Sequence, residues 1–559
     1  MISTKKHIQQ LAAILKAKGI CDIVISPGSQ SGALVHTLAA NGFFNCRNIV
    51  DERSAGYFAI GLSQALQKPV ALVCSSGTAT LNYAPAVAEA FYQNIPLIVL
   101  TADRPTYWIN QGENQSIRQS SIYQGFIRGE ITLPMGESEK ELWFARREIN
   151  ECLNRAVSGN HGPVHINIPL EEPLHDLLPD DLPSVKNIEI AETDTFLSEN
   201  ELHKLAGILN KSEKVLILAG QQNPNRHLEN ILAEFAQKTG AVVLKEHLAN
   251  LNNDCFCGNI DLLITSLLAE NISDFQPDLL ISFGRHFVSK PLKQFLRKNR
   301  PENHWHINIE NEYTDTYQSL TKTIGTKTET FFSQILPLMN SKSNRFFIRW
   351  KEKEKQVTNF RDEFISQSDF CDLLVFSRLQ KHIPENSVLH LGNSSPVRYA
   401  LLFDVLSNIE YFSNRGVSGI DGVMSTAVGF ASESEKINTL VIGDLSFFYD
   451  SNALWNKYIS DNLRIIVIHN GGGNIFGMIK GPDNSPAFKE HFFAENKFSA
   501  QGIALTFGLD YFTASTENEL ETALQKFYSP KQKQAAILEI FTNAEINTQV
   551  FRGLFAGVK

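Results

Sequence analysis

Two apolar runs near the C-terminus, each ending in a polar residue, constrain the fold of this chain more than any other feature. The stretch NTLVIGDLSFFYDSNALWNKYISDNLRIIVIHNGGGNIF runs from Asn438 to Phe476, with Asp444 after the first apolar run and Asn470 after the second. The segment between the runs is long enough for a helical crossover, so we expect a parallel β-α-β unit. Both polar residues then lie at the carboxyl ends of neighbouring strands, where open α/β sheets bind ligands.

The polar groups expected at this sheet edge are oxygen donors. Asp444 offers a carboxylate, Asn470 offers an amide oxygen, and the Gly471-Gly472-Gly473 turn offers backbone oxygens and N–H groups. Hard oxygen ligands without histidine or cysteine suit Mg²⁺, which completes its octahedron with water and phosphate oxygens. The sequence therefore predicts a clamp for a magnesium-bound diphosphate.

Composition excludes several classes of function. The length of 559 residues suggests three or four domains, and a charged content of 20% is ordinary for a globular protein. No apolar run approaches the roughly 18 residues of a membrane span, and the N-terminus lacks the features of a signal peptide. The net charge of −9 argues against nucleic acid or an anionic membrane as partner. The seven scattered cysteines indicate reduced thiols, and we expect a cytoplasmic protein.

Short aliphatic runs alternate with helical patterns along the whole chain. Besides the two runs above, they are Asp22–Gly28, Pro69–Gly77, Pro96–Pro105, Val164–Leu170, Lys214–Gly220, Ala241–Glu246, Asp278–Gly284, His304–Glu310, Ser387–Asn393 and Ala535–Phe541. This alternation predicts three consecutive doubly wound α/β domains with parallel sheets, at residues 1–180, 195–340 and 360–559. A P-loop and a dinucleotide fingerprint are both missing, so nicotinamide or flavin binding has no support.

Three α/β domains with such a clamp in the last one resemble the thiamine diphosphate-dependent enzymes of the 2-oxo acid decarboxylase type. In that family the N-terminal domain binds the aminopyrimidine, and the C-terminal domain binds the diphosphate with Mg²⁺ or Mn²⁺. The segments SPGSQSGAL, DERSAGYFAIGLS, SSGTATLNYAPAVAEAF, TADRP, GENQSIRQ, GPVHINIPLEEPL, SNRGVSGIDG and HNGGGNIF are similar to one subgroup. Its members decarboxylate 2-oxoglutarate and add the resulting succinyl carbanion equivalent to isochorismate in menaquinone biosynthesis. SNRG…GIDG is the most specific segment, because simple decarboxylases lack it.

The resemblance implies a role for a glutamate far from the clamp. The cofactor is activated when a carboxylic acid hydrogen-bonds its pyrimidine ring, and an apolar setting must raise the pKa of that acid. Glu52 in NIVDERSAGYF matches this catalytic acid, although without the resemblance it reads as a solvated acid at a helix start. Ile420 matches the bulky residue that bends the cofactor into a V, and Gly472 joins Asp444 and Asn470 as a metal ligand. The other implied cofactor contacts are Pro27, Thr78, Gly443, Leu445, Ser446, Gly473 and Ile475.

The implied substrates carry several carboxylates, which arginine binds in a planar, bidentate manner. The residues that match substrate positions are Ser29, Gln30, Arg104, Gln115, Lys290, Ser394, Arg398 and Arg415. Two positions depart from the family pattern: Gln30 stands where relatives have arginine, and Pro291 stands where they tend to have a second basic residue. Losing one such pair costs about 2–3 kcal/mol, on the order of a hundredfold in affinity, unless another arginine such as Arg118 compensates. His469, where many relatives have asparagine, is a milder departure.

Three hypotheses remain open from the sequence. The first is the reaction of 2-oxoglutarate with isochorismate, and the second is a related carboligase or decarboxylase with a different acceptor, suggested by Gln30 and Pro291. The third is a catalytically silent member of the family, against which Glu52 argues. The resemblance also implies a homodimer or a dimer of dimers, in which Glu52 of one subunit and Asp444 of another share a cofactor.

Overall fold

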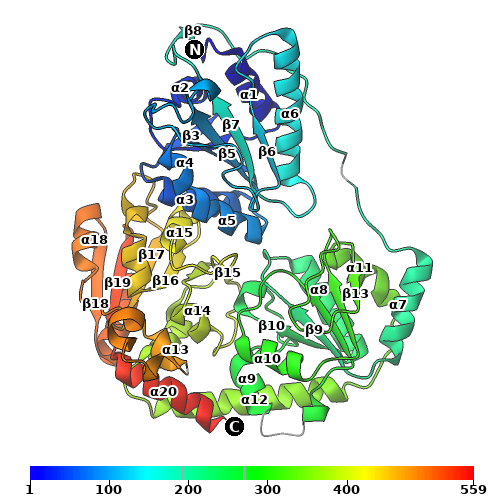
Figure 1. Cartoon of the computed structure of the whole chain (residues 1–559). Helices are drawn as coiled ribbons and strands as arrows, with labels where there is room; N and C mark the ends of the chain where they lie inside the picture. Colours follow the sequence, from blue (N-terminus) through cyan, green and yellow to red (C-terminus); the bar gives the residue numbers. More distant parts are fainter. Residues whose placement is uncertain (192, 268–271, 480, 559) are drawn as a thin grey trace. The chain divides into compact units, whose positions relative to one another are not determined.

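The computed structural model describes residues 1–191, 193–267, 272–479 and 481–558 (Figure 1). The chain divides into two compact units. Unit 1 comprises Met1–Glu192, Asn414–Glu435 and Ser446–Leu463, and unit 2 comprises Thr193–Ser413, Lys436–Leu445 and Arg464–Lys559. The three large sheets are parallel and surrounded by helices, which confirms the predicted fold class. The boundaries at 1–180, 195–340 and 360–559 stay a prediction.

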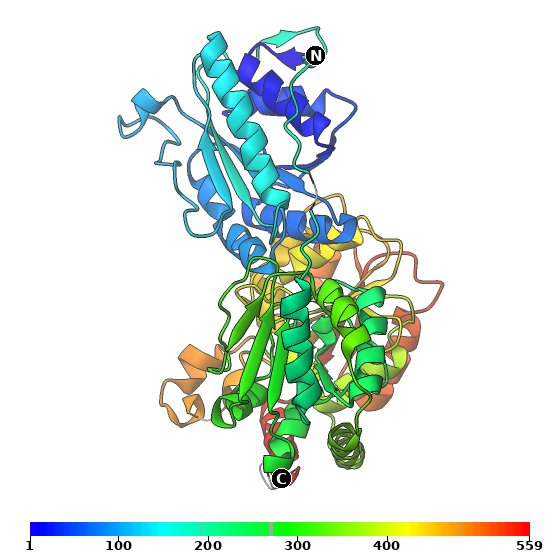
Figure 2. The same ribbon diagram turned by 90° about the vertical axis from the view of Figure 1, so that its right-hand side faces the viewer.

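Unit 1 holds a six-stranded sheet with the order β3-β2-β4-β5-β7-β6. Its strands are β2 (Asp22–Ile25), β3 (Asn45–Asn48), β4 (Val70–Cys74), β5 (Leu97–Asp103), β6 (Gly129–Thr132) and β7 (Val164–Pro169). The chain goes from β2 to β3 on one side and then to β4 on the other, which creates a switch point between β2 and β4. Helices α1 (Lys6–Ala17) and α6 (Glu139–Val157) pack together beside this sheet (Figure 2).

A close crossing of two helices fixes the segment around residue 420 within unit 1. Helices α3 (Glu52–Leu66) and α15 (Val423–Ala431) cross at glycines, because a Cβ on Gly61 would lie 1.9 Å from the Thr426 carbonyl oxygen. The Tyr57 hydroxyl also donates to Asp421 Oδ2 at 2.7 Å, just before α15. Helix α3, which begins at Glu52, therefore packs tightly against the end of the SNRG…GIDG segment and the helix that follows it.

Unit 2 holds two sheets. The central sheet has the order β10-β9-β11-β12-β13, and the second has the order β15-β14-β16-β17-β19-β18. The strands are β9 (Val215–Ala219), β10 (Val242–Lys245), β11 (Leu279–Phe283), β12 (Asn303–Ile307), β13 (Lys322–Ile324), β14 (Val388–Leu391), β15 (Glu410–Phe412), β16 (Asn438–Gly443), β17 (Leu463–His469), β18 (Asp510–Ala514) and β19 (Ala536–Phe541). The six-stranded sheet repeats the connectivity of the sheet in unit 1, with its switch point between β14 and β16. Helix α12 (Arg345–Ser366) packs on both α9 (Ile260–Ser266) and α13 (Asp372–His382).

The cysteines and the helices relate to two expectations from the sequence, which are reduced thiols and no membrane span. All seven cysteines are free thiols. In the described ranges, no helix combines the length and the apolar character that a bilayer crossing requires.

Two buried histidines of the central sheet share one serine hydroxyl. Ser282 Oγ on β11 lies 2.8 Å from His304 Nε2 and 3.0 Å from His306 Nδ1 on β12. Burial and, to a smaller extent, the neighbouring His306 lower the pKa of His304 to about 4. Burial also lowers the pKa of His306. Both rings are therefore neutral in the folded protein near neutral pH.

We expect acid to destabilise this sheet through His304. Its folded-state pKa of about 4 lies below its ordinary value of 6.5, so its contribution to stability is present above pH 6.5 and is lost as the pH falls toward 4. The unfolding midpoint of H304Q should consequently fall less than that of the wild type between pH 6.5 and 4. Thermal unfolding followed by circular dichroism measures this, with the exposed His203→Gln as control. Equal pH slopes for wild type and H304Q would contradict the expectation.

Candidate cofactor and substrate site

The predicted metal ligands lie together at the carboxyl edge of the second sheet of unit 2. Asp444 directly follows Gly443, the last residue of β16, and Asn470 directly follows β17, the neighbouring strand. Both side chains are buried, with 2% of Asp444 and 7% of Asn470 exposed. Asp444 Oδ1 accepts from Leu445 N at 2.8 Å, and Oδ2 accepts from Asn496 Nδ2 at 3.2 Å. Burial raises the pKa of Asp444, so a cation at this edge would stabilise its charged form.

A buried aspartate orients the amide of Asn470. Asn470 Nδ2 donates to Asp372 Oδ2 at 2.9 Å, and the Thr542 hydroxyl donates to Asp372 Oδ1 at 2.6 Å. Burial raises the pKa of Asp372 to about 6, although these two donors act in the opposite direction. Because the amide nitrogen donates to Asp372, Asn470 Oδ1 is the atom that would bind the predicted metal ion. The donor set therefore fits Mg²⁺, and Asp372 holds one ligand in the required orientation.

His469, the mildest of the three departures from the family pattern, belongs to a second polar network beside Asp444. Its Nδ1 lies 2.7 Å from Glu539 Oε1, and its Nε2 lies 3.8 Å from Asp444 Oδ2. Burial disfavours its charge, but the bond to Glu539 and the charge of Asp444 together raise the pKa of His469. Glu539 also accepts from the Tyr511 hydroxyl at 2.6 Å and from Ala500 N at 3.0 Å. The network holds the imidazole in a fixed position beside the predicted metal ligand.

The triple-glycine turn has the backbone that its sequence predicts. Gly471 and Gly472 have φ values of 82° and 147°, and a Cβ on Gly472 would lie 2.5 Å from the Phe493 carbonyl oxygen. Any other residue at 472 would be strained, so the turn keeps its backbone bare. Gly473 is the last glycine of the turn, and the expected helix beyond it is α17 (Ile475–Met478). This helix has only four residues, so its dipole contributes less than a long helix would.

Three of the predicted substrate residues lie in unit 2. Lys290 is the exposed first residue of α10 (Lys290–Lys298), after β11. Ser394 follows β14 and is the residue before α14 (Ser395–Ala400); its φ of 72° is a backbone conformation that is uncommon outside glycine and that occurs at functional sites. Arg398 Nη1 donates to the Ser394 carbonyl oxygen at 2.5 Å. Burial raises the pKa of Asp261, and the nearby positive charge of Arg398 opposes this rise.

In unit 1, the predicted residues gather at the carboxyl edge of the first sheet. Pro27 and Ser29 are exposed after β2, Thr78 is the exposed first residue of α4 (Thr78–Asn82), and Arg104 directly follows β5. Gln115 comes from a distant loop, but a Cβ on Gly77 would lie 3.2 Å from its carbonyl oxygen. These residues therefore surround the switch point between β2 and β4, the expected ligand position of such a sheet.

Glu52 also lies at this edge, as the half-buried first residue of α3. The preceding Asp51 caps the helix by accepting from Ser54 N at 3.1 Å. Glu52 Oε2 accepts from Asn82 Nδ2 at 3.2 Å. The cap fixes the first turn of the helix, which leaves Glu52 as an oriented carboxyl group at the sheet edge.

Gln30 differs from its neighbours because its side chain points into the protein. Only 1% of Gln30 is exposed, and its Nε2 donates to the carbonyl oxygens of Asp103 and Leu170, both at 2.8 Å. Both N–H groups of the amide are therefore occupied, and the remaining oxygen would repel a carboxylate. Direct binding of a substrate carboxylate by Gln30 stays a prediction, and it would require both bonds to break.

Three predicted residues from the C-terminal part of the sequence belong to unit 1. Ile420 is 39% exposed, so it is a large apolar side chain open to solvent and not a core residue. The hydroxyl of Ser446, which the sequence analysis places on the diphosphate, donates instead to the Ile420 carbonyl oxygen. Arg415 is half-buried in the loop before Ile420. The Ser446 contact holds Ile420, so binding of a diphosphate oxygen would need the hydroxyl to rotate.

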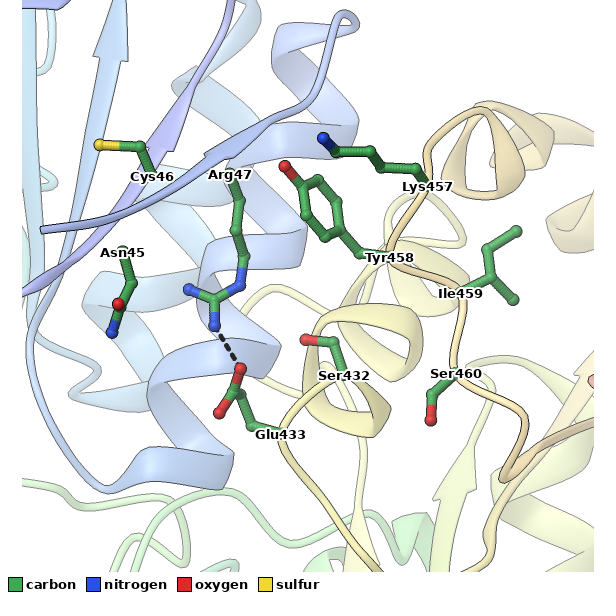
Figure 3. A pocket seen from close by; sticks show the side chains of 9 residues that line it. All are labelled: Asn45, Cys46, Arg47, Ser432, Glu433, Lys457, Tyr458, Ile459 and Ser460. Carbon is green, nitrogen blue, oxygen red and sulfur yellow. Dashed lines mark hydrogen bonds and ion pairs between the residues drawn. The ribbon is translucent and has the colours of Figure 1, made fainter. Parts of the chain in front are cut away.

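Unit 1 also contains a polar hollow of about 470 Å³ that the sequence analysis does not predict (Figure 3). It is lined by Asn45, Cys46, Arg47, Ser432, Glu433, Lys457, Tyr458, Ile459 and Ser460. Arg47 Nη1 pairs with Asp22 Oδ1 at 2.9 Å, and its Nη2 pairs with Glu433. The guanidinium is neutralised on both sides, and none of the predicted site residues lines this hollow.

Comparison with known proteins identifies the family. Residues 5–122 match "Thiamine pyrophosphate enzyme, N-terminal TPP binding domain", and residues 187–391 match "Middle domain of thiamine pyrophosphate", the pyrophosphate being another name for the diphosphate. Benzoylformate decarboxylase from Polynucleobacter necessarius has the same fold, with a TM-score of 0.73 over 97% of this chain and 99% of that chain at 16% identity.

Closer relatives cover the whole sequence. The chain is 39% identical over 566 residues to 2-succinyl-5-enolpyruvyl-6-hydroxy-3-cyclohexene-1-carboxylate synthase of Phocaeicola vulgatus, covering 100% of this chain and 99% of the relative. It is 40% identical over 548 residues to the synthase of the same name from Flavobacterium psychrophilum, covering 98% of each. The chain therefore belongs to the 2-succinyl-5-enolpyruvyl-6-hydroxy-3-cyclohexene-1-carboxylate synthase family of thiamine diphosphate-dependent enzymes.

Proposed function

We propose that this protein decarboxylates 2-oxoglutarate and adds the succinyl carbanion equivalent to isochorismate, giving 2-succinyl-5-enolpyruvyl-6-hydroxy-3-cyclohexene-1-carboxylate and CO₂ in menaquinone biosynthesis. The full-length identity to synthases of that name supports the reaction. The structural observation that carries it is that Asp444 and Asn470 follow neighbouring strands, and that the Asn470 amide nitrogen donates to Asp372. This arrangement provides the oxygen ligands for a magnesium-bound diphosphate.

Bound thiamine diphosphate would supply the carbon nucleophile, and the residues of the chain would hold and activate it. Asp444, Asn470 and the Gly472 carbonyl would bind Mg²⁺, for which Mn²⁺ is an alternative, and Leu445, Gly473 and Ile475 would contact the diphosphate. The protonated Glu52 carboxyl group would donate a hydrogen bond to the pyrimidine ring. The exposed Ile420 would support the bent form of the cofactor, with Pro27 and Thr78 beside the pyrimidine.

The acceptor carboxylates would bind to cationic side chains. Arg104, Arg398 and Arg415 provide planar donors, and Lys290 provides a point charge. Ser29, Gln115 and Ser394 would supply neutral hydrogen bonds. In this assignment the charged residues select a polycarboxylate acceptor, and the Gln30 amide supports the backbone beside them.

We also propose a homodimer, or a dimer of dimers, in which each cofactor lies between Glu52 of one subunit and Asp444 of another. This arrangement is what the resemblance to thiamine diphosphate-dependent enzymes of the 2-oxo acid decarboxylase type implies. Sedimentation of the purified protein tests it, because a monomer that is fully active would rule it out.

A second candidate is a carboligase of the same cofactor with a different acceptor. The observation that favours it is that Gln30 donates both N–H groups to backbone carbonyls and cannot replace an arginine toward a substrate. Incubation of the protein with thiamine diphosphate, Mg²⁺, 2-oxoglutarate and isochorismate separates the candidates. An isochorismate-dependent product supports the synthase, whereas CO₂ release without that product supports the second candidate. No turnover of any 2-oxo acid would contradict both.

A further inference from the structure

Two buried glutamates each accept hydrogen bonds from two successive backbone N–H groups, in the loops that carry Arg415 and Lys290. We propose that Glu89 and Glu246 are positioning residues, which hold these two loops so that Arg415 and Lys290 meet the carboxylates of the acceptor. The inference rests on the proposed function for the identity of that acceptor. The hydrogen bonds themselves are features of the structure.

The first clamp lies within unit 1. Glu89 is on α5 (Ala84–Gln93), and only 1% of it is exposed. Its Oε1 accepts from Gly416 N at 2.7 Å, and its Oε2 accepts from Val417 N at 2.8 Å. A Cβ on Gly416 would lie 2.6 Å from the Glu89 carbonyl oxygen, so the close approach requires glycine at the residue after Arg415.

The second clamp lies within unit 2 and has the same form. Glu246 directly follows β10 and is 3% exposed. Its Oε2 accepts from Val288 N and its Oε1 accepts from Ser289 N, both at 2.7 Å. Ser289 Oγ in turn accepts from Leu292 N at 3.2 Å and so caps the helix that begins at Lys290. The backbone immediately before Lys290 is therefore fixed from both sides.

Both clamps use a carboxylate where a neutral side chain could not serve equally well. Two neighbouring N–H groups need two acceptors, and only a carboxylate offers an acceptor at each of its ends. Burial raises the pKa of Glu89, but the two N–H groups, Gln93 and the charge of Arg415 all favour the ionised form. Arginine and lysine have flexible side chains, so a fixed backbone reduces the ordering that substrate binding demands.

The test is the variants E89Q and E246Q in the holoenzyme. Glutamine keeps the shape of the side chain, but its NH₂ group would face one of the two backbone N–H groups. One of the two hydrogen bonds is therefore lost. We expect the KM for isochorismate to rise about ten- to a hundredfold, while the KM for 2-oxoglutarate and kcat at saturating isochorismate stay within about threefold. E354Q is the control, because Glu354 is also a buried acceptor of a backbone N–H group, that of Gly258, and its other hydrogen-bond partner is Lys351. A selective rise in KM absent from E354Q supports the proposal, and unchanged KM values in both test variants overturn it.

Hydrogen–deuterium exchange tests the clamps without any substrate. E89Q should speed exchange at Gly416 and Val417 but not at Val288 and Ser289, and E246Q should do the reverse. Unchanged exchange at these residues would overturn the positioning role, whatever the enzyme catalyses. If the wild type makes no isochorismate-dependent product although the exchange follows this pattern, the proposed function fails and the clamps stand.

Discussion

The variant E52Q is expected to lose about 10²- to 10⁴-fold in kcat, the range that a positioned acid–base group contributes. Glutamine preserves the shape of the side chain and the contact of Asn82 with an oxygen, but it cannot supply a carboxyl proton to the cofactor ring. Binding of Mg²⁺ should be unchanged, because its predicted ligands are Asp444, Asn470 and Gly472, and thiamine diphosphate should still bind through the predicted contacts to its diphosphate. CO₂ release from 2-oxoglutarate measures the loss, and titration of cofactor binding by tryptophan fluorescence measures the retention.

E139Q is a matched control for this experiment. Glu139 is the first residue of α6, as Glu52 is of α3, and it also follows a side chain that caps its helix. E139Q should keep normal activity. Full activity in E52Q would show that another group activates the cofactor, and loss of cofactor binding would show that Glu52 acts in binding.

The second large effect is expected from D444N. An amide oxygen is a weaker ligand for Mg²⁺ than a carboxylate, and its nitrogen would repel the cation. We expect the affinity for thiamine diphosphate at fixed Mg²⁺ to fall about a hundredfold or more, which corresponds to about 2.8 kcal/mol. Calorimetric titration of the cofactor at several Mg²⁺ concentrations measures the change. Partial recovery at high Mg²⁺ is expected, and D369N, at an exposed aspartate of the same unit, should bind normally.

Mixing the two inactive variants extends this prediction to the subunit arrangement. If Glu52 and Asp444 of different subunits share a cofactor, mixed dimers of E52Q and D444N contain one intact site. Activity should then return on mixing, toward about a quarter of the wild type for random exchange of subunits. Mixed dimers that stay inactive, once exchange is demonstrated, would contradict shared sites.

The interior of each sheet could be predicted from the sequence, and most of the sheet edges could not. Strands such as β4 and β17 are buried along their whole length and read as continuous apolar runs. In the three large sheets, the strands that the sequence pattern does not indicate are β3, β6, β13, β15 and β18, and each lies at the edge of its sheet. An edge strand has one neighbour and is partly solvated, as in Asn45–Asn48, so its sequence shows no apolar run.

In the predicted site, the residues that directly follow a strand could be predicted, and the residues that reach the site from distant parts of the sequence could not. Asp444 and Asn470 were predictable because each directly follows an apolar strand. Asp372 and Glu539, which hold Asn470 and His469, were missed because they are far away in the sequence and stand in no motif. Contacts of this kind arise only when the strands pair. Gln30 shows the opposite difficulty, since the motif predicts a substrate ligand and the structure gives its amide two backbone partners.

The shared connectivity of the two six-stranded sheets means that each strand end occurs twice in this chain. With the strands of each sheet counted in chain order, Ser29 and Ser394 follow the first strand. Thr78 and Asp444 follow the third, and Arg104 and Asn470 follow the fourth. The two sheets therefore place different side chains at the ends of their third and fourth strands. Substitutions at the predicted metal ligands after β16 and β17 would then alter metal affinity, and substitutions in the loops after β2 and β5 would alter the predicted acceptor contacts. In the proposed assignment, a change of acceptor can therefore leave the predicted metal ligands unaltered.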